Sequence, residues 1–206
     1  AADLHDVVEL HGSGGERRTA NRPLPAGRIG VVPAVIFSVL LGALSVPLLV
    51  WGVNALTGIL GLLSLLSYAL VYTPMKARTH WAMIVGAIPG AIPPLMGWTA
   101  ATNTVGIPAL VVFSILFFWQ LPHFIAIALF RKDEYAAAGL QSLPIAKGDD
   151  MARLHAALYA LILIPVSLLL GFSQTAGSIY LISAMVLGTI FFFVGSFALV
   201  PLLPTG

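Results

Sequence analysis

The sequence contains no cysteine among its 206 residues, and only 9% of its residues are charged. The lack of cysteine excludes a disulfide framework and a metal site built from thiolates. A soluble globular protein carries about 25% charged residues, so the low charge and the 59% hydrophobic content predict a chain that sits in a lipid bilayer. The net charge is only +2, and no basic stripe with interleaved aromatic residues is present, so we expect no nucleic-acid partner.

Long apolar runs fill most of the chain. Each is free of Asp, Glu, Lys and Arg and approaches the roughly 20 residues that a helix needs to cross a bilayer. There are six of them, at about residues 30–53, 55–73, 81–101, 107–130, 154–172 and 177–200. The pattern predicts an all-α membrane protein, a helical bundle with about six transmembrane helices.

The charged residues are confined to three connections. Residues 1–29, 74–80 and 131–153 hold all 10 Lys and Arg and all 8 Asp and Glu. With six spans, these three connections lie on one face, and the positive-inside rule makes that face cytoplasmic, or matrix-side in a mitochondrion. We therefore expect an integral protein of the bacterial plasma (inner) membrane, or of the mitochondrial inner membrane if the source is eukaryotic.

The first charged loop places carboxylates before arginines. Asp6 and Glu9 precede a run of basic residues that comprises Arg17, Arg18, Arg22 and Arg28. Carboxylate oxygens suit Mg²⁺, and guanidinium groups fork onto phosphate oxygens, so the loop suits a metal–diphosphate at the membrane surface. A basic loop that only holds its side of the membrane is the better interpretation for this cluster taken alone.

The other two loops carry similar groups. Lys76 and Arg78 follow a span directly, and a simple positive-inside anchor explains them equally well. In the third loop, Asp133 and Glu134 lie between two basic residues and Tyr135. Because the two acids are adjacent, only one of them can easily point into a shared site if the segment is helical, and a solvated acid pair is the simpler interpretation.

Two features lie inside the spans. His123 follows Pro122 about two turns inside its span, and a polar residue at that depth usually faces the bundle interior or a water-filled cavity. The stretch IPGAIPPLMG at 88–97 carries three prolines. It predicts either a kinked packing helix or a helix bent around a cavity, and the stretch alone does not favour one of them.

Several stretches together resemble the protoheme IX farnesyltransferases, or heme O synthases, a branch of the UbiA-type intramembrane prenyltransferases. They are TANRPLPAGRI at 19–29, YTPMKART at 72–79, GAIPGAIPPLMGW at 86–98, and WQLPHF with DEYAAAGLQSLPI within 119–145. The resemblance implies a fold of nine membrane helices around a cavity, with the six spans as helices three to eight. Residues 1–206 are then expected to be a single integral-membrane domain, a fragment without the first two helices and the last.

The resemblance also implies a reaction. The farnesyl group of farnesyl diphosphate is transferred to a vinyl group of heme b, which gives heme O, and Mg²⁺ assists the departure of diphosphate. Heme b is then a substrate rather than a cofactor. The implied partners are farnesyl diphosphate, heme b, the lipid bilayer and a downstream heme A synthase.

Site residues follow from the same resemblance. The metal ligands are expected to be Asp6, Glu9, Asp133 and Glu134. The diphosphate is expected to bind Arg18, Arg22, Arg28, Lys76, Arg78 and Arg131. Catalytic roles are expected for His123, Tyr135 and Lys76. Phe117, Phe118 and Phe124 either line the cavity or face lipid, and the sequence does not favour one of these.

The chain departs from the family pattern at four positions. Alignment on Arg18 without a gap places Glu9 on an acid of the first acidic motif, but it places His5 and Ser13 where the family has Asn and Asp. After the second motif, Ala152 and His155 replace Thr and Gln. Two alternatives stay open: a UbiA-type transferase with an aromatic or quinone-precursor acceptor, and a transporter or non-catalytic membrane protein.

Overall fold

The structure is a computed structural model that describes residues 23–24, 26–173 and 175–199, with side chains up to residue 195. Within these residues every regular element is a helix. The long helices are α2 (Val31–Gly52), α3 (Ala55–Leu66), α5 (Ala82–Thr102), α6 (Ile107–Phe130), α9 (Asp149–Phe172) and α10 (Ser178–Leu199). The short ones are the π-helix η1 (Ser67–Tyr72), α4 (Thr73–Met75), α7 (Lys132–Ala137) and α8 (Leu143–Lys147).

Six segments are long and apolar enough to cross a membrane within the described part of the chain. One of them, Ala55–Met75, joins α3, η1 and α4 into a continuous span of 21 residues. The predicted number of spans and the all-α fold class are therefore confirmed, and the protein is an integral membrane protein.

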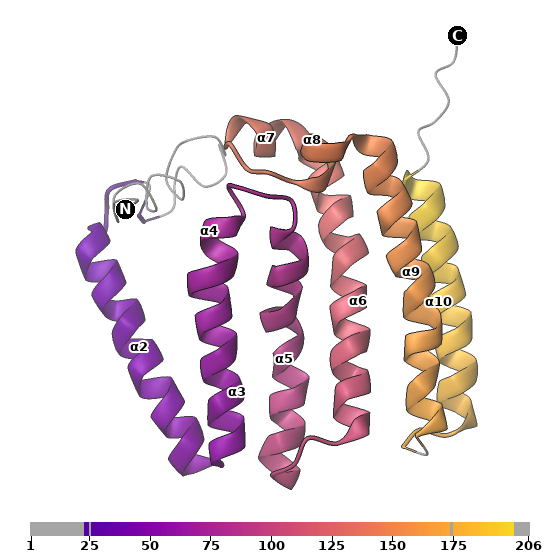
Figure 1. Cartoon of the computed structure of the whole chain (residues 1–206), viewed down its shortest axis with the longest axis horizontal. Coiled ribbons are helices and arrows are strands. Elements are labelled where there is room, and N and C mark those ends of the chain that lie inside the picture. The colour runs from indigo at the N-terminus through magenta and orange to yellow at the C-terminus, as the bar shows by residue number, and fades with distance from the viewer. Residues whose placement is uncertain (1–22, 25, 174, 200–206) are drawn as a thin grey trace.

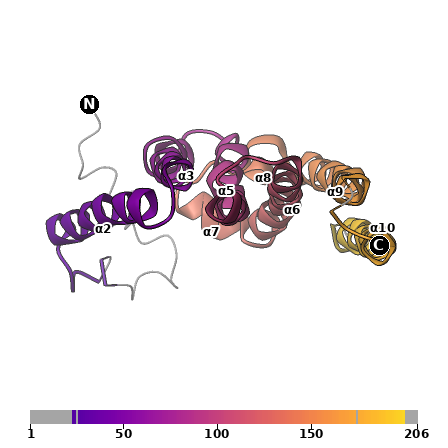
Figure 2. The ribbon, with the colours of Figure 1, turned by 90° about the horizontal axis from the view of Figure 1, so that it is seen from below.

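The six spans stand side by side in the order of the sequence (Figure 1). Each packs on its neighbour along the chain, from α2 against α3 to α9 against α10. Seen from one end, they form a row with α2 and α10 at its two extremes (Figure 2). The short helices α7 and α8 cross one end of this row, above α5 and α6 (Figure 1).

The core lies in the middle of the row, where α5, α6 and α9 pack together. Ile125 of α6 contacts Ala152 and Ala156 of α9 and Leu143 of α8, and all four are buried. Small residues four positions apart on α9 let the α6 backbone approach closely, which is the usual way that membrane helices associate. In contrast, α2 buries no residue and is an outer member of the row.

Helix α5 passes through its three prolines without interruption. Pro93 cannot donate to the carbonyl of Pro89, and the Ser64 hydroxyl of α3 donates to that carbonyl at 3.4 Å instead. On the side of α5 that faces α6, Gly90 allows the Gln120 side chain of α6 to approach closely, because a Cβ at residue 90 would lie 2.1 Å from the Gln120 Oε1 atom. The prolines therefore lie in a packed helix between α3 and α6, which supports the first of the two interpretations left open by the sequence.

Helix α9 begins five residues earlier than the apolar run that predicted it. It starts at Asp149 rather than at residue 154, because Gly148 adopts φ of 85° and allows α8 to turn directly into α9. Two aspartates fill its first turn, where negative charge is favourable beside the exposed backbone N–H groups. A hydropathy pattern cannot detect such a start, since the first turn is polar.

Candidate active site

Two of the three charged loops meet at one end of the row. The backbone N–H of Gln141 donates to the carbonyl oxygen of Lys76 at 3.2 Å, which joins the loop after α6 to the loop before α5. The Lys132 ammonium lies 2.7 Å from the Asp149 carboxylate and ties the start of α7 to the start of α9. The segment that contains α7 and α8 is thereby fastened across the helix ends.

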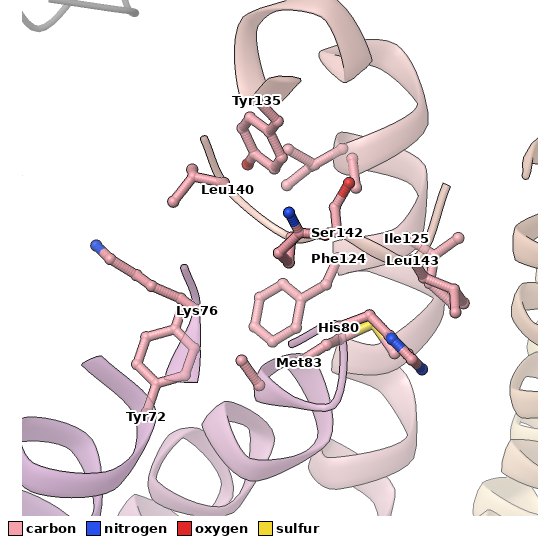
Figure 3. A pocket seen from close by; sticks show the side chains of 14 residues that line it. Tyr72, Lys76, His80, Met83, Phe124, Ile125, Tyr135, Leu140, Ser142 and Leu143 are labelled. Atoms are coloured by element: carbon pink, nitrogen blue, oxygen red, sulfur yellow. The ribbon is translucent and has the colours of Figure 1, made fainter. Parts of the chain in front are cut away.

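A pocket of about 380 Å³ lies beneath this segment (Figure 3). Residues from the spans and from both loops line it. They are Tyr72, Lys76, His80, Ala82, Met83, Phe124, Ile125, Ile127, Ala128, Tyr135, Leu140, Gln141, Ser142 and Leu143. The pocket therefore combines a polar upper part from the loops with an apolar lower part from α5 and α6.

Tyr72 and Lys76 share one side of the pocket (Figure 3). They lie four residues apart where η1 leads into α4, so their side chains lie on the same helix face. The Tyr72 ring rests against Gly86 of α5, where a Cβ would lie 2.6 Å from the ring atom Cε2. A glycine at residue 86 is thus what allows the tyrosine ring to approach α5 this closely.

The lower wall is apolar and partly aromatic. Met83 comes from the first turn of α5, and Phe124, Ile127 and Ala128 come from the last two turns of α6. Phe124 lies within the pocket, which is the first of the two positions left open for it (Figure 3). Phe117 and Phe118, which lie nearer the start of α6, do not line the pocket. This wall suits a hydrocarbon chain that enters from the bilayer.

His80 adds an ionisable group that our interpretation of the sequence did not single out. It lines the pocket from the loop just before α5. Burial lowers the pKa of the His80 imidazole below its usual range, and the nearby Lys147 and His155 side chains lower it further. The ring is therefore a neutral group near pH 7, next to residues that bring positive charge to this side of the pocket.

Asp133 and Glu134 lie in the first turn of α7, and both are exposed. The Glu134 carboxylate lies 3.7 Å from the Arg131 guanidinium, whereas Lys132 pairs with Asp149 rather than with its neighbour Asp133. No group of three or more His, Asp or Glu side chains that could hold a metal ion occurs among the described residues. These two acids therefore supply at most part of a metal site.

The predicted basic residues have different positions. Lys76 lines the pocket, whereas Arg28 and Arg78 are exposed and Arg131 pairs with Glu134. The remaining predicted ligands lie outside the described residues: Asp6, Glu9, Arg18 and Arg22. Of the predicted site residues, the structure brings together Lys76 and Tyr135.

His123 lies on an exposed face of α6 rather than in the pocket. Its ring stacks on the Trp119 ring one turn earlier, with centroids 5.3 Å apart and planes inclined by 10°. Ile127 lies one turn after His123 and lines the pocket. The Trp119–His123 pair therefore lies on α6 just beyond one edge of the pocket. The pair offers a flat aromatic surface at membrane depth.

Sequence reasoning missed several pocket residues, and some left a detectable signal. Tyr72 lies four residues before Lys76, a spacing that places two side chains on one helix face. His80, Gln141 and Ser142 left no such signal, because their contribution depends on how two loops approach each other, and the residues joined there, Lys76 and Gln141, are 65 positions apart.

Comparison with known proteins identifies the family of the chain. The profile of the UbiA prenyltransferase family matches residues 11–201. The chain belongs to the UbiA prenyltransferase family. A protoheme IX farnesyltransferase of Myxococcus xanthus is 51% identical over 193 residues, which are 94% of this chain and 66% of that protein. A protoheme IX farnesyltransferase of Sorangium cellulosum is 49% identical over 182 residues, which are 88% of this chain and 65% of that protein.

A third relative shows the same relationship at greater distance. A protoheme IX farnesyltransferase of Anaeromyxobacter dehalogenans is 47% identical over 172 residues, which are 84% of this chain and 58% of that protein. The chain thus spans somewhat under two thirds of the length of these UbiA-family relatives. No solved structure matches it.

Proposed function

We propose that this chain is the core of an intramembrane farnesyltransferase that converts heme b to heme O. The observation that carries the proposal is the pocket under the charged loops, which places Lys76 and Tyr135 above an apolar wall. The relatives named protoheme IX farnesyltransferase support this choice of donor and acceptor within the UbiA family.

The reaction breaks the bond between C1 of the farnesyl group and the diphosphate oxygen, and the electron pair leaves with diphosphate. The vinyl group of heme b attacks the resulting allylic cation and forms the new carbon–carbon bond. Water then adds to the carbon beside the porphyrin ring and loses a proton, which leaves the hydroxyl of heme O. Farnesyl diphosphate, heme b and water are consumed, and heme O, diphosphate and a proton are formed.

The residues of the pocket fit the two demands of this chemistry. The Lys76 ammonium and the Tyr135 hydroxyl lie at the polar end, where they stabilise the charge that develops on the leaving diphosphate. Phe124 and Met83 form the apolar wall, which keeps water from the allylic cation until the carbon–carbon bond has formed. The aromatic face of Phe124 also attracts a cation.

Mg²⁺ would neutralise part of the diphosphate charge. Asp133 and Glu134 have the hard oxygen atoms that this ion prefers, and Asp6 and Glu9 are the proposed ligands from the other loop. Arg18, Arg22, Arg28, Arg78 and Arg131 are proposed to hold the diphosphate from the same membrane face.

His123 is proposed to hold the porphyrin of the acceptor. Its imidazole is exposed on α6 and stacks on Trp119, so it offers a ring nitrogen for the iron and an aromatic neighbour for the macrocycle. We place the charged loops on the cytoplasmic side of a bacterial plasma membrane, and we expect a heme A synthase to receive the product.

Conversion of heme b to heme O by the purified protein tests the proposal. The protein in lipid nanodiscs, with Mg²⁺ and farnesyl diphosphate, should give a product with the mass of heme O. Glu134→Ala and Glu9→Ala should abolish turnover if these carboxylates bind the metal. Unchanged turnover in both variants would contradict the metal assignment, and the absence of any farnesylated heme from the unaltered protein would contradict the function.

A quinone-precursor acceptor is the second candidate within the UbiA family. The same assay with 4-hydroxybenzoate in place of heme b separates the two, because only one acceptor should gain the farnesyl group. Farnesylated 4-hydroxybenzoate with unreacted heme would favour this alternative.

A further inference from the structure

Three basic or ionisable residues lie on segments that converge at one side of the pocket: His80, Lys147 and His155, here called the basic cluster. They come from the loop before α5, from the last turn of α8 and from the second turn of α9. Met83 of α5 packs against the buried cluster that joins Leu143 of α8 to two alanines of α9, which brings the three segments together. The charges of Lys147 and His155 act on His80 across this junction. His80 is the member that lines the pocket itself.

The basic cluster lies apart from Lys76. In Figure 3, His80 lies near Ile125 and Leu143, whereas Lys76 lies on the opposite side of the pocket near Tyr72. The pocket therefore has two separate polar regions with the apolar wall between and below them. Two anionic groups on different molecules could be held there at the same time without sharing a cation.

The carboxylates near the basic cluster already have partners. Asp149 pairs with Lys132 at 2.7 Å, and Asp150 lies 3.7 Å from the Arg153 guanidinium. Among the residues that the structure describes, no carboxylate forms an ion pair with Lys147, which is exposed. The positive charge of the cluster is thus not neutralised from within the described part of the chain.

His155 has one ring nitrogen directed to the backbone. Its Nδ1 atom lies 2.7 Å from the carbonyl oxygen of Met151, and a carbonyl can only accept a hydrogen bond. Nδ1 therefore carries a proton, and Nε2 is the nitrogen left for another group. A protonated Nε2 would donate to an anion beside His80 and Lys147.

We propose that the basic cluster binds the carboxylates of the acceptor. This inference rests on the proposed function, in which the acceptor is heme b. Heme b carries two propionates on one side of the macrocycle and its vinyl groups on the other. Propionates held by the basic cluster at the membrane surface would direct the vinyl groups toward the apolar wall, where the farnesyl group is bound. The cluster is therefore a positioning site for the acceptor, separate from the diphosphate groups at Lys76.

Comparison of hemin with hemin dimethyl ester tests this role. In the ester, the two propionates are esterified and carry no charge. Binding of each to the full chain in nanodiscs of zwitterionic lipid would be followed by the Soret absorbance. We expect the unaltered protein to bind hemin about tenfold more tightly than the ester, because hydrogen bonds to charged groups are the strong ones. The variants His80→Gln, Lys147→Gln and His155→Gln should each reduce this preference, and Lys147→Gln changes only an exposed side chain.

Arg153→Gln is the matched control. It removes one positive charge from the same turn of α9 but not from the basic cluster, so the preference for hemin should remain about tenfold. Equal binding of hemin and its ester by the unaltered protein would overturn the inference and assign the cluster to lipid headgroups. A preference that survives all three cluster variants would also overturn it.

Heme O formation, measured on the same samples, separates this inference from the proposed function. Equal binding of the two porphyrins together with normal heme O formation would overturn the carboxylate site and leave the transferase standing. Failure to bind either porphyrin, together with no heme O, would overturn the function and the inference with it.

Discussion

The two ends of the helix row are built in different ways. At the uncharged end, neutral side chains join neighbouring helices: the Asn54 amide donates to the carbonyl of Thr99 at 2.8 Å, and the Thr57 and Thr99 hydroxyls are 2.9 Å apart. At the charged end, α7 and α8 cross above a pocket, and an ion pair between two partly exposed side chains, Lys132 and Asp149, fastens α7 to α9. The uncharged end thus joins α3 to α5 through neutral side chains, and its pocket between α6 and α9 has no ionisable lining residue. The pocket at the charged end is lined by the ionisable side chains of Lys76, His80 and Tyr135.

Because of this difference, we expect substitutions at the uncharged end to change mainly stability and substitutions at the charged end to change mainly activity. Thr57 and Thr99 are buried, and Asn54 also accepts from the Thr57 N–H at 2.9 Å, so the network is satisfied within the protein. Buried polar groups of this kind stabilise a fold only when each one has a partner. The polar pocket residues Tyr72, Lys76, His80 and Tyr135 instead lie partly exposed around an open volume, so their replacement should affect binding and chemistry more than folding.

The largest effect is expected from Lys76→Gln at the charged end. It removes the ammonium that we propose faces the leaving diphosphate, so the rate of heme O formation should fall about 100-fold, the usual cost of losing one group that stabilises transition-state charge. The unfolding temperature should stay unchanged, because Lys76 is not part of the core. An unchanged rate would show that the diphosphate binds elsewhere.

The next effect is expected at the uncharged end. Thr99→Val leaves the buried Thr57 hydroxyl without its side-chain partner and should lower the free energy of unfolding by about 1–3 kcal/mol. The double variant Thr57→Val with Thr99→Val should recover part of the loss, since both partners are then apolar. Urea unfolding in micelles measures both. The hydrogen-bond network would be contradicted if the double variant lost more unfolding free energy than the two single variants together. A large loss of activity per folded molecule would also contradict it.

A smaller effect is expected on the titration of His80. Because burial is the larger cause of its lowered pKa, Lys147→Gln should raise the pKa toward the ordinary 6.5 without reaching it. A lowered pKa means that the folded state resists protonation, so this residue lowers stability as the pH falls through 6.5 and below. Histidine ring NMR signals, assigned with His80→Gln, report the pKa. A pKa that does not move would place Lys147 away from His80.

The smallest effect is expected from Lys132→Gln, which breaks the ion pair with Asp149. Both side chains are 40% exposed, so the loss of unfolding free energy should be under about 1 kcal/mol. Heme O formation should persist, which also makes this variant the charge-matched control for Lys76→Gln. A loss of activity as large as that of Lys76→Gln would show that the fastening of α7 and α8 itself is needed for turnover.

The sequence predicted the spans well, because the bilayer demands long apolar helices and gathers charge into the connections. It did not predict the start of α9 at Asp149, since a polar first turn has no hydropathy signal. The apolar runs at 30–53 and 55–73 left Asn54 between two spans without a role, whereas Asn54 caps the start of α3 and bonds both Thr57 and Thr99.

The site was predictable only in part. Lys76 and Tyr135 were identified through motifs, and the structure brings them to one pocket. The contribution of His80 depends on the approach of the loop before α5 to α8 and α9, since His80 and Lys147 are 67 residues apart, and no local pattern encodes this approach. Asp6 and Glu9 lie outside the described residues, so their part in the site stays a prediction.

Photoaffinity labelling with a diazirine analogue of farnesyl diphosphate tests most directly whether the reaction takes place at the charged end. After irradiation of the protein in nanodiscs, mass spectrometry locates the label. We predict label in residues 72–83 and 124–143, which line the pocket, and its loss when unlabelled farnesyl diphosphate is added in excess. Competable label in residues 54–57 or 99–111, at the uncharged end, would contradict this account.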